Sequence, residues 1–540
     1  MKKMTIMNRI YYLILIASLF FVVTSCEDLD TYPEGSTVTS AIKEEVMEKD
    51  PSKAEAGVNA IFAQFTTYMP NAGALGAERH NDFGYPSVML FTDHNGYDLV
   101  SDDNGYNWNG NNLEYSDRSY TSFETQILWN DMYAIINMAN NVIGSIPEDV
   151  EDPTSQFFLA QGLAARSFSY WVLAQLYQFN YVGNESKPCV PIITSENSDD
   201  AALEGASRAT VQEVYDLINS DINAAILLLE SAENEGMNRA DKRYIDLAVA
   251  YGLRARVNLT MHKWSEAAAD ATKAIDLSSA TPAGISDVNK PAFWTADESN
   301  WMWGIIIQET DRVVTSGIVN WPSHMGSLNY GYNNFNGGKQ INKLLYESIS
   351  ESDVRKGWWL DENQSSPNLS GDLAKAAEDY GHPAYTQVKF APYKNEAKTS
   401  TNSNDIPLMR IEEMYLIKAE AEAMSGGNGK ATLEDFINSY RDPSYVCTAT
   451  GPEEIQEEVF RHRRIELWGE GLNWFDIMRL NKGVDRRGGG FPNATMVFNI
   501  PAGSDILLWR IPEAEIQANT ALSEGDNNPS APAPTPVPDL

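Results

Sequence analysis

The sequence predicts a mostly α-helical protein made of paired helices with loop-rich insertions between them. Three observations lead to this fold class. Small and apolar residues recur at helical spacing through several long segments, which favours close helix pairing over sheet. Two other segments are rich in Trp, Asn, Gly, Ser and Tyr and show little helical periodicity. Apolar residues make up 43% of the 540 residues, which is enough for a large core.

The N-terminus has the features of a bacterial lipoprotein leader. Basic residues precede an apolar run at 11–23 that is too short to span a bilayer as a helix, and small residues lead from it to Cys26. We therefore expect residues 1–25 to be removed as a signal peptide and Cys26 to carry a lipid anchor. An ordinary secretory leader with a chance cysteine is the alternative.

Residues 26–40 are expected to form a lipidated acidic tether, which continues from Cys26 with Glu27 and Asp28. Acidic residues directly after a lipidated cysteine resemble the surface-export signal of Bacteroidetes lipoproteins. The resemblance implies a protein that is anchored in the outer membrane by its lipid and faces the outside of the cell.

The chain is strongly acidic, with a formal net charge of −35 at pH 7. Such a surface repels nucleic acid and anionic lipid, whereas its negative electrostatic potential does not repel neutral ligands such as sugars. We therefore expect no nucleic-acid partner. No later run reaches the length of about 18 apolar residues that a spanning helix needs, so the lipid is the only membrane attachment that the sequence predicts.

Helical hairpins are expected over residues 129–277. Their helices are predicted at Trp129–Ile146, Gln156–Phe179, Thr210–Leu229 and Ala248–Leu277. Thr210 and Glu213 have the spacing of a capping box at the start of the third helix. The last segment turns at 262–264 and resembles a tetratricopeptide unit, in which small residues let one helix nest against the next. The small residues at these positions are Ala255, Ala267 and Ala274.

Loop-rich insertions are expected at about 79–120 and 280–400, where helical periodicity is weak. Helix returns at 409–424 and 452–481, on either side of a glycine-rich break. The end of the chain, 527–540, holds five prolines and no periodic apolar pattern, which predicts a disordered tail.

Cys189 and Cys447 are expected to be buried thiols, with a disulfide between them as the alternative.

The stretch from Phe460 to Arg479 resembles the C-terminal signature of the SusD/RagB family, outer-membrane glycan-binding lipoproteins of Bacteroidetes. The matching positions are Arg464, Glu466, Glu470, Gly471, Trp474, Phe475, Asp476 and Arg479. Residues 410–421 and 511–516 resemble the family's preceding helix and closing segment, so the signature region spans 405–519. With the lipid-attachment motif and the tetratricopeptide-like hairpins, the likeness implies one SusD-like domain over 41–526.

The signature is predicted to be structural. Asp476 and Arg479 lie three residues apart, and Glu466 and Glu470 lie four apart, so on a helix they form stacked polar rows. A buried network of arginines and carboxylates would lock the helices together, and a catalytic role for these residues is the alternative.

Two stretches combine aromatic rings with side-chain amides, the mixture that holds sugars by stacking and hydrogen bonds. The candidate ligand-binding residues are Tyr106, Asn107, Trp108 and Asn109 in the first, and Trp321, Tyr330 and Tyr332 in the second. In SusD-like proteins one early and one mid-chain insertion supply the aromatic residues of the glycan site. Trp108 and Trp321 are expected to lie in loops, where their loss would remove a stacking face without opening a core cavity.

Catalysis and metal binding receive little support. The chain has no zinc-protease, serine-hydrolase, Cys-x-x-Cys or phosphate-loop motif, so we expect no enzyme, no cofactor and no metal. Asp98, Asp102, Asp103 and Asn104 could coordinate calcium as an alternative, but their spacing does not fit a calcium loop.

The leading hypothesis is therefore a non-enzymatic surface lipoprotein that captures an oligosaccharide. The resemblance implies delivery of this ligand to a SusC-like TonB-dependent transporter. A peptide- or protein-binding scaffold of tetratricopeptide type is the second hypothesis, and a surface glycoside hydrolase is the third.

Overall fold

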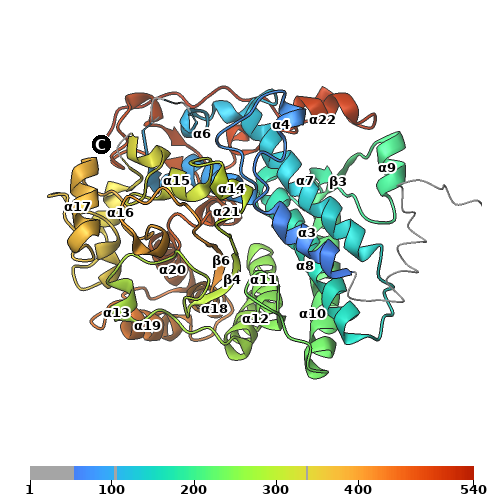
Figure 1. Cartoon of the computed structure of the whole chain (residues 1–540), viewed down its shortest axis with the longest axis horizontal. Helices are drawn as coiled ribbons and strands as arrows, with labels where there is room; N and C mark the ends of the chain where they lie inside the picture. The colour runs from blue at the N-terminus through green and yellow to red at the C-terminus, as the bar shows by residue number, and fades with distance from the viewer. Residues whose placement is uncertain (1–53, 103–105, 107, 336–337) are drawn as a thin grey trace, which may run out of the picture. The chain divides into compact units, whose positions relative to one another are not determined.

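Helices dominate the structure, as the sequence predicts, and all strands are short (Figure 1). The computed structural model describes residues 54–102, 106, 108–335 and 338–540. The predicted signal peptide, Cys26 with its tether, and Asn107 lie outside these residues. Among the helices of this described part, none is long and apolar enough to cross a membrane.

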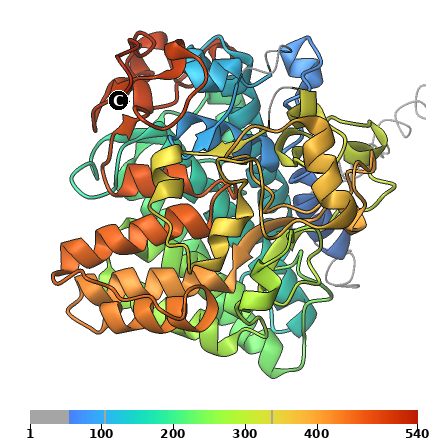
Figure 2. The same ribbon diagram turned by 90° about the vertical axis from the view of Figure 1, so that its left-hand side faces the viewer.

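The long helices pack in a row that follows their order in the chain (Figure 1). They are α3 (Ala54–Gln64), α7 (Phe123–Ile143), α8 (Pro153–Tyr177), α10 (Val211–Asn234), α11 (Leu247–Thr260), α12 (Trp264–Leu277) and α18 (Ile411–Met424). Each packs on the next, and α18 also packs on α19 (Gly429–Tyr440) and α20 (Pro452–Glu466), the orange helices of Figure 2. The predicted hairpins are therefore part of a longer helical stack.

Local sequence explains where these helices begin. The side chains of Ser122, Asp152 and Asp246 each accept a hydrogen bond from the first turn of α7, α8 and α11. The predicted capping box at Thr210 is confirmed, since its hydroxyl and the Glu213 carboxylate each accept a backbone N–H of the other residue, at 3.2 and 2.7 Å. The three alanines predicted to lie between paired helices, Ala255, Ala267 and Ala274, are fully buried.

In the described part of the chain the strands form four two-stranded antiparallel pairs. They are β1 (Leu99–Val100) with β5 (Gln340–Ile341), β2 (Pro188–Pro191) with β3 (Arg208–Thr210), β4 (Trp301–Ile305) with β6 (Ile406–Arg410), and β7 (Val484–Asp485) with β8 (Asn499–Ile500). In β4 both Trp301 and Trp303 are buried, and Trp303 lies opposite Met409 of β6. This pair joins the 280–400 insertion to the signature region.

Short helices give the insertions more regular structure than the sequence predicts. In the insertions they are α5 (Tyr85–Asn95), α6 (Gly110–Glu114), η2 (Ser116–Arg118), α13 (Ile285–Val288), α14 (Arg312–Thr315), α15 (Trp321–Met325), η3 (Tyr332–Phe335), α16 (Lys343–Glu347), η4 (Val354–Trp358), α17 (Gly371–Tyr380) and η5 (Tyr393–Asn395). Two more short helices, α4 (Ala72–Leu75) and α9 (Ser198–Glu204), lie outside the insertions. The C-terminal ones are α21 (Asn473–Arg479), η6 (Ala494–Met496), η7 (Asp505–Leu507), α22 (Glu513–Ala518) and η8 (Glu524–Asp526).

The prediction of one helix over 452–481 is wrong. The chain leaves the helix after Glu466 and starts α21 at Asn473, because Gly469 and Gly471 adopt left-handed conformations, with φ of 76° and 70°. A Cβ atom at Gly471 would lie 2.6 Å from Cβ of Met89, so the break brings the signature against α5.

The C-terminal segment is held to the body at several points, in contrast to the predicted disordered tail. Asn528 Nδ2 donates to the carbonyls of Tyr177 and Trp509 at 2.8 and 2.7 Å. The Val537 N–H donates to the carbonyl of Val497 at 2.9 Å, and its side chain packs on a small apolar cluster that includes Phe491. The Asp539 carboxylate accepts the N–H of Gly488.

Cys189 and Cys447 are both buried and free, as expected for thiols.

Candidate ligand-binding site

Five aromatic side chains from the two insertions meet in one aromatic cluster. Its members are His80, Tyr106, Trp108, His324 and Tyr332. The His80 ring stacks on Trp108 with centroids 4.8 Å apart, and the Tyr332 ring contacts His80, Tyr106 and His324 at 5.8, 5.6 and 4.8 Å. Tyr106, Trp108 and Tyr332, predicted from separate stretches of sequence, therefore lie together.

The cluster runs from the surface into the core. Tyr106 is 57% exposed, His80 and Trp108 are half-buried, and Tyr332 is only 5% exposed. His80 Nδ1 is hydrogen-bonded to the Tyr332 hydroxyl. The rings within reach of a ligand are therefore Tyr106, Trp108 and His80, and Tyr332 supports them from below.

Burial lowers the pKa of both imidazoles of the cluster. Desolvation lowers the pKa of His80 against the opposing effect of the Glu78 carboxylate, and the nearby Arg79 guanidinium acts in the same direction as burial. Desolvation lowers the pKa of the fully buried His324 to about 3, while its Nε2 bonds the carbonyl of His80 at 3.0 Å. The cluster therefore offers ring faces and neutral hydrogen-bonding groups, which suit a sugar.

A polar network on α7 fixes the position of Trp108. Glu124, in the first turn of α7, accepts hydrogen bonds from Arg79 at 3.3 Å and from Asn111 at 3.1 Å. Asn81 donates to the Trp108 carbonyl at 2.9 Å, and the Arg79 guanidinium lies 4.8 Å from the Trp108 ring centroid. Sequence reasoning missed these supports and His80, because isolated polar residues at the start of an insertion form no recognisable motif.

The other predicted ligand-binding residues occupy different environments. Trp321 opens α15 and packs edge-on against Phe390 at 5.0 Å with 3% exposure, so the expectation of an exposed loop position is wrong. Asn109 is fully buried. Tyr330 is 44% exposed, and its backbone N–H donates to the carbonyl of Thr399.

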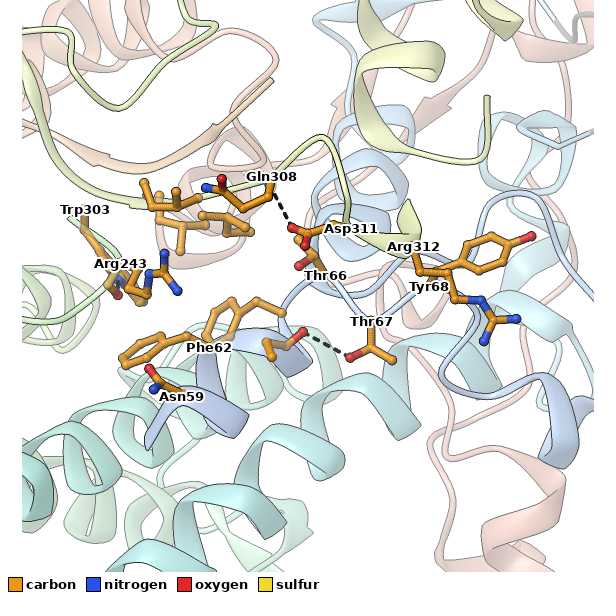
Figure 3. A pocket seen from close by; sticks show the side chains of 16 residues that line it. Asn59, Phe62, Thr66, Thr67, Tyr68, Arg243, Trp303, Gln308, Asp311 and Arg312 are labelled. Carbon is orange, nitrogen blue, oxygen red and sulfur yellow. Dashed lines mark hydrogen bonds between the residues drawn. The ribbon is translucent and has the colours of Figure 1, made fainter. Parts of the chain in front are cut away.

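A pocket of about 370 Å³ lies between α3 and the segment after β4; we call it the Phe62 pocket (Figure 3). Phe62, Ile305 and Leu408 contribute apolar walls, and Asn59 and Arg243 lie at one end. Tyr68 and Arg312 lie at the other end, with the guanidinium 5.1 Å from the ring centroid.

Glu466 and Glu470 of the signature belong to a buried ion network with charged residues from earlier segments, which we call the signature network. Its cations are Arg355, Lys389, Arg410 and Arg441, and its anions are Asp353, Glu412, Glu466 and Glu470. All eight are buried. Such pairing supports the structural interpretation of the signature.

Glu466 lies at the centre of the signature network. Its carboxylate accepts hydrogen bonds from Arg441 at 2.8 Å, from Arg410 at 3.1 Å and from Arg355 at 3.2 Å. Burial alone would raise the pKa of Glu466, but these three guanidinium groups outweigh it and hold the pKa well below its usual value.

The remaining signature charges are paired as well. Asp476 accepts from Arg479 at 2.8 Å, at the predicted three-residue spacing, and from Arg463 at 2.7 Å. Asp98, a candidate calcium ligand in the sequence, accepts from Arg464 and Asn473. Within the described ranges, no group of three or more His, Cys, Asp or Glu side chains is placed to hold a metal ion.

Comparisons with known proteins agree with these observations. Residues 45–259 match a family model described as "Starch-binding associating with outer membrane", and residues 359–529 match the model of the SusD family. The SusD-like protein P38 of Formosa agariphila is 24% identical over 67% of this chain and 73% of its own length. The SusD-like protein P2 of the same organism is 25% identical over 74% of this chain and 79% of its own.

Solved structures share the fold. The SusD-like carbohydrate binding protein from Bacteroides vulgatus superposes with a TM-score of 0.71 at 22% identity, over 89% of this chain and 98% of its own. A laminarin binding SusD-like protein gives a TM-score of 0.60 at 17% identity, over 89% and 99%. With the two family models, the signature residues and the helical stack in agreement, the chain belongs to the SusD/RagB family of carbohydrate-binding proteins that associate with the outer membrane.

Proposed function

We propose that this protein captures an oligosaccharide outside the cell at the aromatic cluster and delivers it to a SusC-like TonB-dependent transporter. The observation that carries the proposal is the meeting of Tyr106, Trp108 and His80 at the surface. SusD-family proteins are binding proteins and not enzymes, so the cluster has only to hold its ligand.

The chemistry of the cluster suits a neutral sugar. Aromatic faces stack on the C–H faces of a pyranose, and nearby amides and hydroxyls bond its rim. The net charge of −35 opposes anionic polymers but not neutral ones. The relative that binds laminarin, a glycan, shares the fold at low identity and is consistent with this ligand class.

Attachment and delivery rest on the sequence. Cys26 and the acidic tether at 26–40 would hold the domain at the outer membrane, facing outward. A short tether also keeps the domain near any transporter in the same membrane, which raises the effective concentration of the two partners. A mild-detergent pull-down of the lipidated protein should recover a TonB-dependent transporter, and its absence would count against delivery.

Alanine substitution of the exposed rings tests capture directly. Trp108→Ala and Tyr106→Ala should each weaken glycan binding about two- to tenfold, the range of one aromatic contact. Trp264→Ala is the matched control, because this half-buried tryptophan stacks on His262 outside the cluster. Affinity electrophoresis on glycans and a parallel peptide panel would decide between glycan capture and the peptide-binding alternative.

The proposal fails if neither cluster variant differs from the Trp264→Ala control while all three keep the melting temperature of the wild type. Binding of peptides but of no glycan would favour a scaffold of tetratricopeptide type. Release of shortened products from the glycan panel would instead indicate a hydrolase.

A further inference from the structure

We propose that the ligand-binding surface continues from the aromatic cluster to a second aromatic pair, Trp294 and Tyr393, so that the protein holds one long neutral glycan at two separate points. The inference rests on the proposed glycan-binding function and extends it to the length and charge of the ligand.

The second pair stands in a pocket of its own, which we call the Trp294 pocket. It has a volume of about 630 Å³, and Trp294 and Tyr393 form one wall. Their rings meet edge to face with centroids 5.7 Å apart, and both residues are half-buried, so part of each ring surface remains open to a ligand. This arrangement repeats the chemistry of the aromatic cluster.

Neighbouring groups hold the pair in place without a ligand. Glu298 accepts the backbone N–H groups of Phe293 and Trp294 at 2.7 and 3.2 Å, which fixes the loop that carries the indole. The Tyr393 hydroxyl donates to Glu309 at 2.8 Å. A preformed site of this kind binds with less loss of conformational entropy.

The Phe62 pocket lies beside the Trp294 pocket. The Phe62 and Trp294 pockets share Ile306 and Gln308 in their linings, so they adjoin along the segment after β4. Figure 3 shows Gln308 on one side of the Phe62 pocket and Tyr68 with Arg312 at its far end.

Tyr68 links this far end to the aromatic cluster. Its neighbour Met69 donates its backbone N–H to the carbonyl of Asp82 at 3.1 Å, and Asp82 follows His80 by two residues. The Tyr68 phenol also lies near enough to Tyr332 to contribute to the raised pKa of that residue, after the larger effect of burial. The path from cluster to second pair therefore passes Tyr68, the Phe62 pocket and Gln308.

The volumes favour a chain of several sugars. Each pocket alone has the size of a common small-ligand site, of about 300–1,000 Å³. Gly304 of β4 lines the Phe62 pocket, and a Cβ there would lie 2.9 Å from the Trp301 ring, so this wall of the pocket is tightly packed. A short oligosaccharide can occupy one site, whereas a long one can occupy both.

Charge selects a neutral chain. Four carboxylates line the Trp294 pocket, those of Asp241, Asp297, Glu309 and Asp405, and one lysine, Lys242. Asp241 is paired with Arg243 at 3.1 Å and Glu309 with Lys394 at 2.7 Å, and Lys242 donates to the carbonyl of Glu298 at 2.8 Å. An anionic glycan would still meet the carboxylates of Asp297 and Asp405 at this pocket.

The test compares chain lengths. The probes are size-fractionated oligomers of starch and of laminarin, as trisaccharides and as long chains, with polygalacturonate as the anionic counterpart. Trp294→Ala should weaken binding of the long neutral chains about five- to tenfold and leave the trisaccharides unchanged. Trp108→Ala should weaken both lengths, Trp264→Ala neither, and Trp294→Phe should retain most of the affinity because it keeps a ring.

Melting temperatures establish that each variant is folded. If Trp294→Ala affects long chains and trisaccharides equally, or affects neither while Trp108→Ala affects both, the two-point inference is overturned and capture at the aromatic cluster stands. Binding of none of the probes by the wild type counts against both proposals. Polygalacturonate bound as tightly as the neutral chains would overturn the charge selection.

Discussion

Replacing Glu466 by glutamine should destabilise the protein strongly without touching the ligand site. The side chain is fully buried and accepts four hydrogen bonds from Arg355, Arg410 and Arg441. Glutamine keeps the shape of the side chain but removes its charge, and its amide group turns two of these acceptor positions into donors that face guanidinium donors.

The expected loss is about 3–5 kcal/mol in the free energy of unfolding, the cost of leaving a buried ionic partner uncompensated. The signature network is balanced at four cations and four anions, so the substitution leaves one net buried positive charge. Glu457→Gln on the same helix is the matched control. Glu457 is 60% exposed in its pair with Lys482, and exposed pairs contribute about 0–1 kcal/mol.

Urea unfolding followed by tryptophan fluorescence measures both losses. The pH dependence adds a second check, because the pKa of Glu466 is held well below its usual value of 4.5. The stabilisation is therefore present at neutral pH and is lost as the pH falls through the folded-state pKa, so the gap between wild type and variant should shrink in acid. Equal destabilisation by Glu466→Gln and Glu457→Gln would refute a structural role for the network.

Three further predictions concern a core ring, a buried acid and the anchor. Trp321→Ala should cost about 3–5 kcal/mol, because the ring is buried against Phe390, and an unchanged melting temperature would contradict that burial. Burial raises the pKa of Asp82 from 3.8 to about 7, so the folded state keeps a proton that the unfolded chain releases, and stability should fall as the pH rises from about 4 to 7. Thermal melts across this pH range should show a smaller fall in the melting temperature of Asp82→Asn than of the wild type. Identical pH profiles of the two proteins would contradict the proposed effect of Asp82. Cys26→Ala should release the protein from the outer-membrane fraction, and full retention in a strain without the transporter would show that another group is the anchor.

Local signals predicted the helical part of the fold well. The capping box at Thr210 and the buried Ala255 and Ala267 depend on neighbours within a few residues or on the adjacent helix, so spacing in the sequence was sufficient. The break at Gly469 was missed, because helical periodicity on both sides obscured two glycines that the contact with α5 requires.

Long-range contacts limited the prediction of the site. Composition identified the two insertions, and the structure brings Tyr106 and Tyr332 into contact across more than two hundred residues. Composition could not show that Trp108 is only half-buried whereas Trp321 belongs to the core. The burial of Trp321 depends on its contact with Phe390, which lies far along the chain. The network partners Arg355 and Lys389 were missed for the same reason, because no short-range pattern connects them to Glu466.

The balanced charge of the signature network disfavours partly folded states of the region that contains it. Its members extend from Asp353 to Glu470, and any partly assembled state that buries some of them leaves a charge without its partner. Such states are costly, and they are scarcely populated compared with the complete core or the open chain. A chain truncated before Glu466 would retain the helices of the N-terminal stack but could not close this core. Arg410 at the end of β6 pairs with Glu466 and Glu470, so loss of these carboxylates should also weaken the β4–β6 pair.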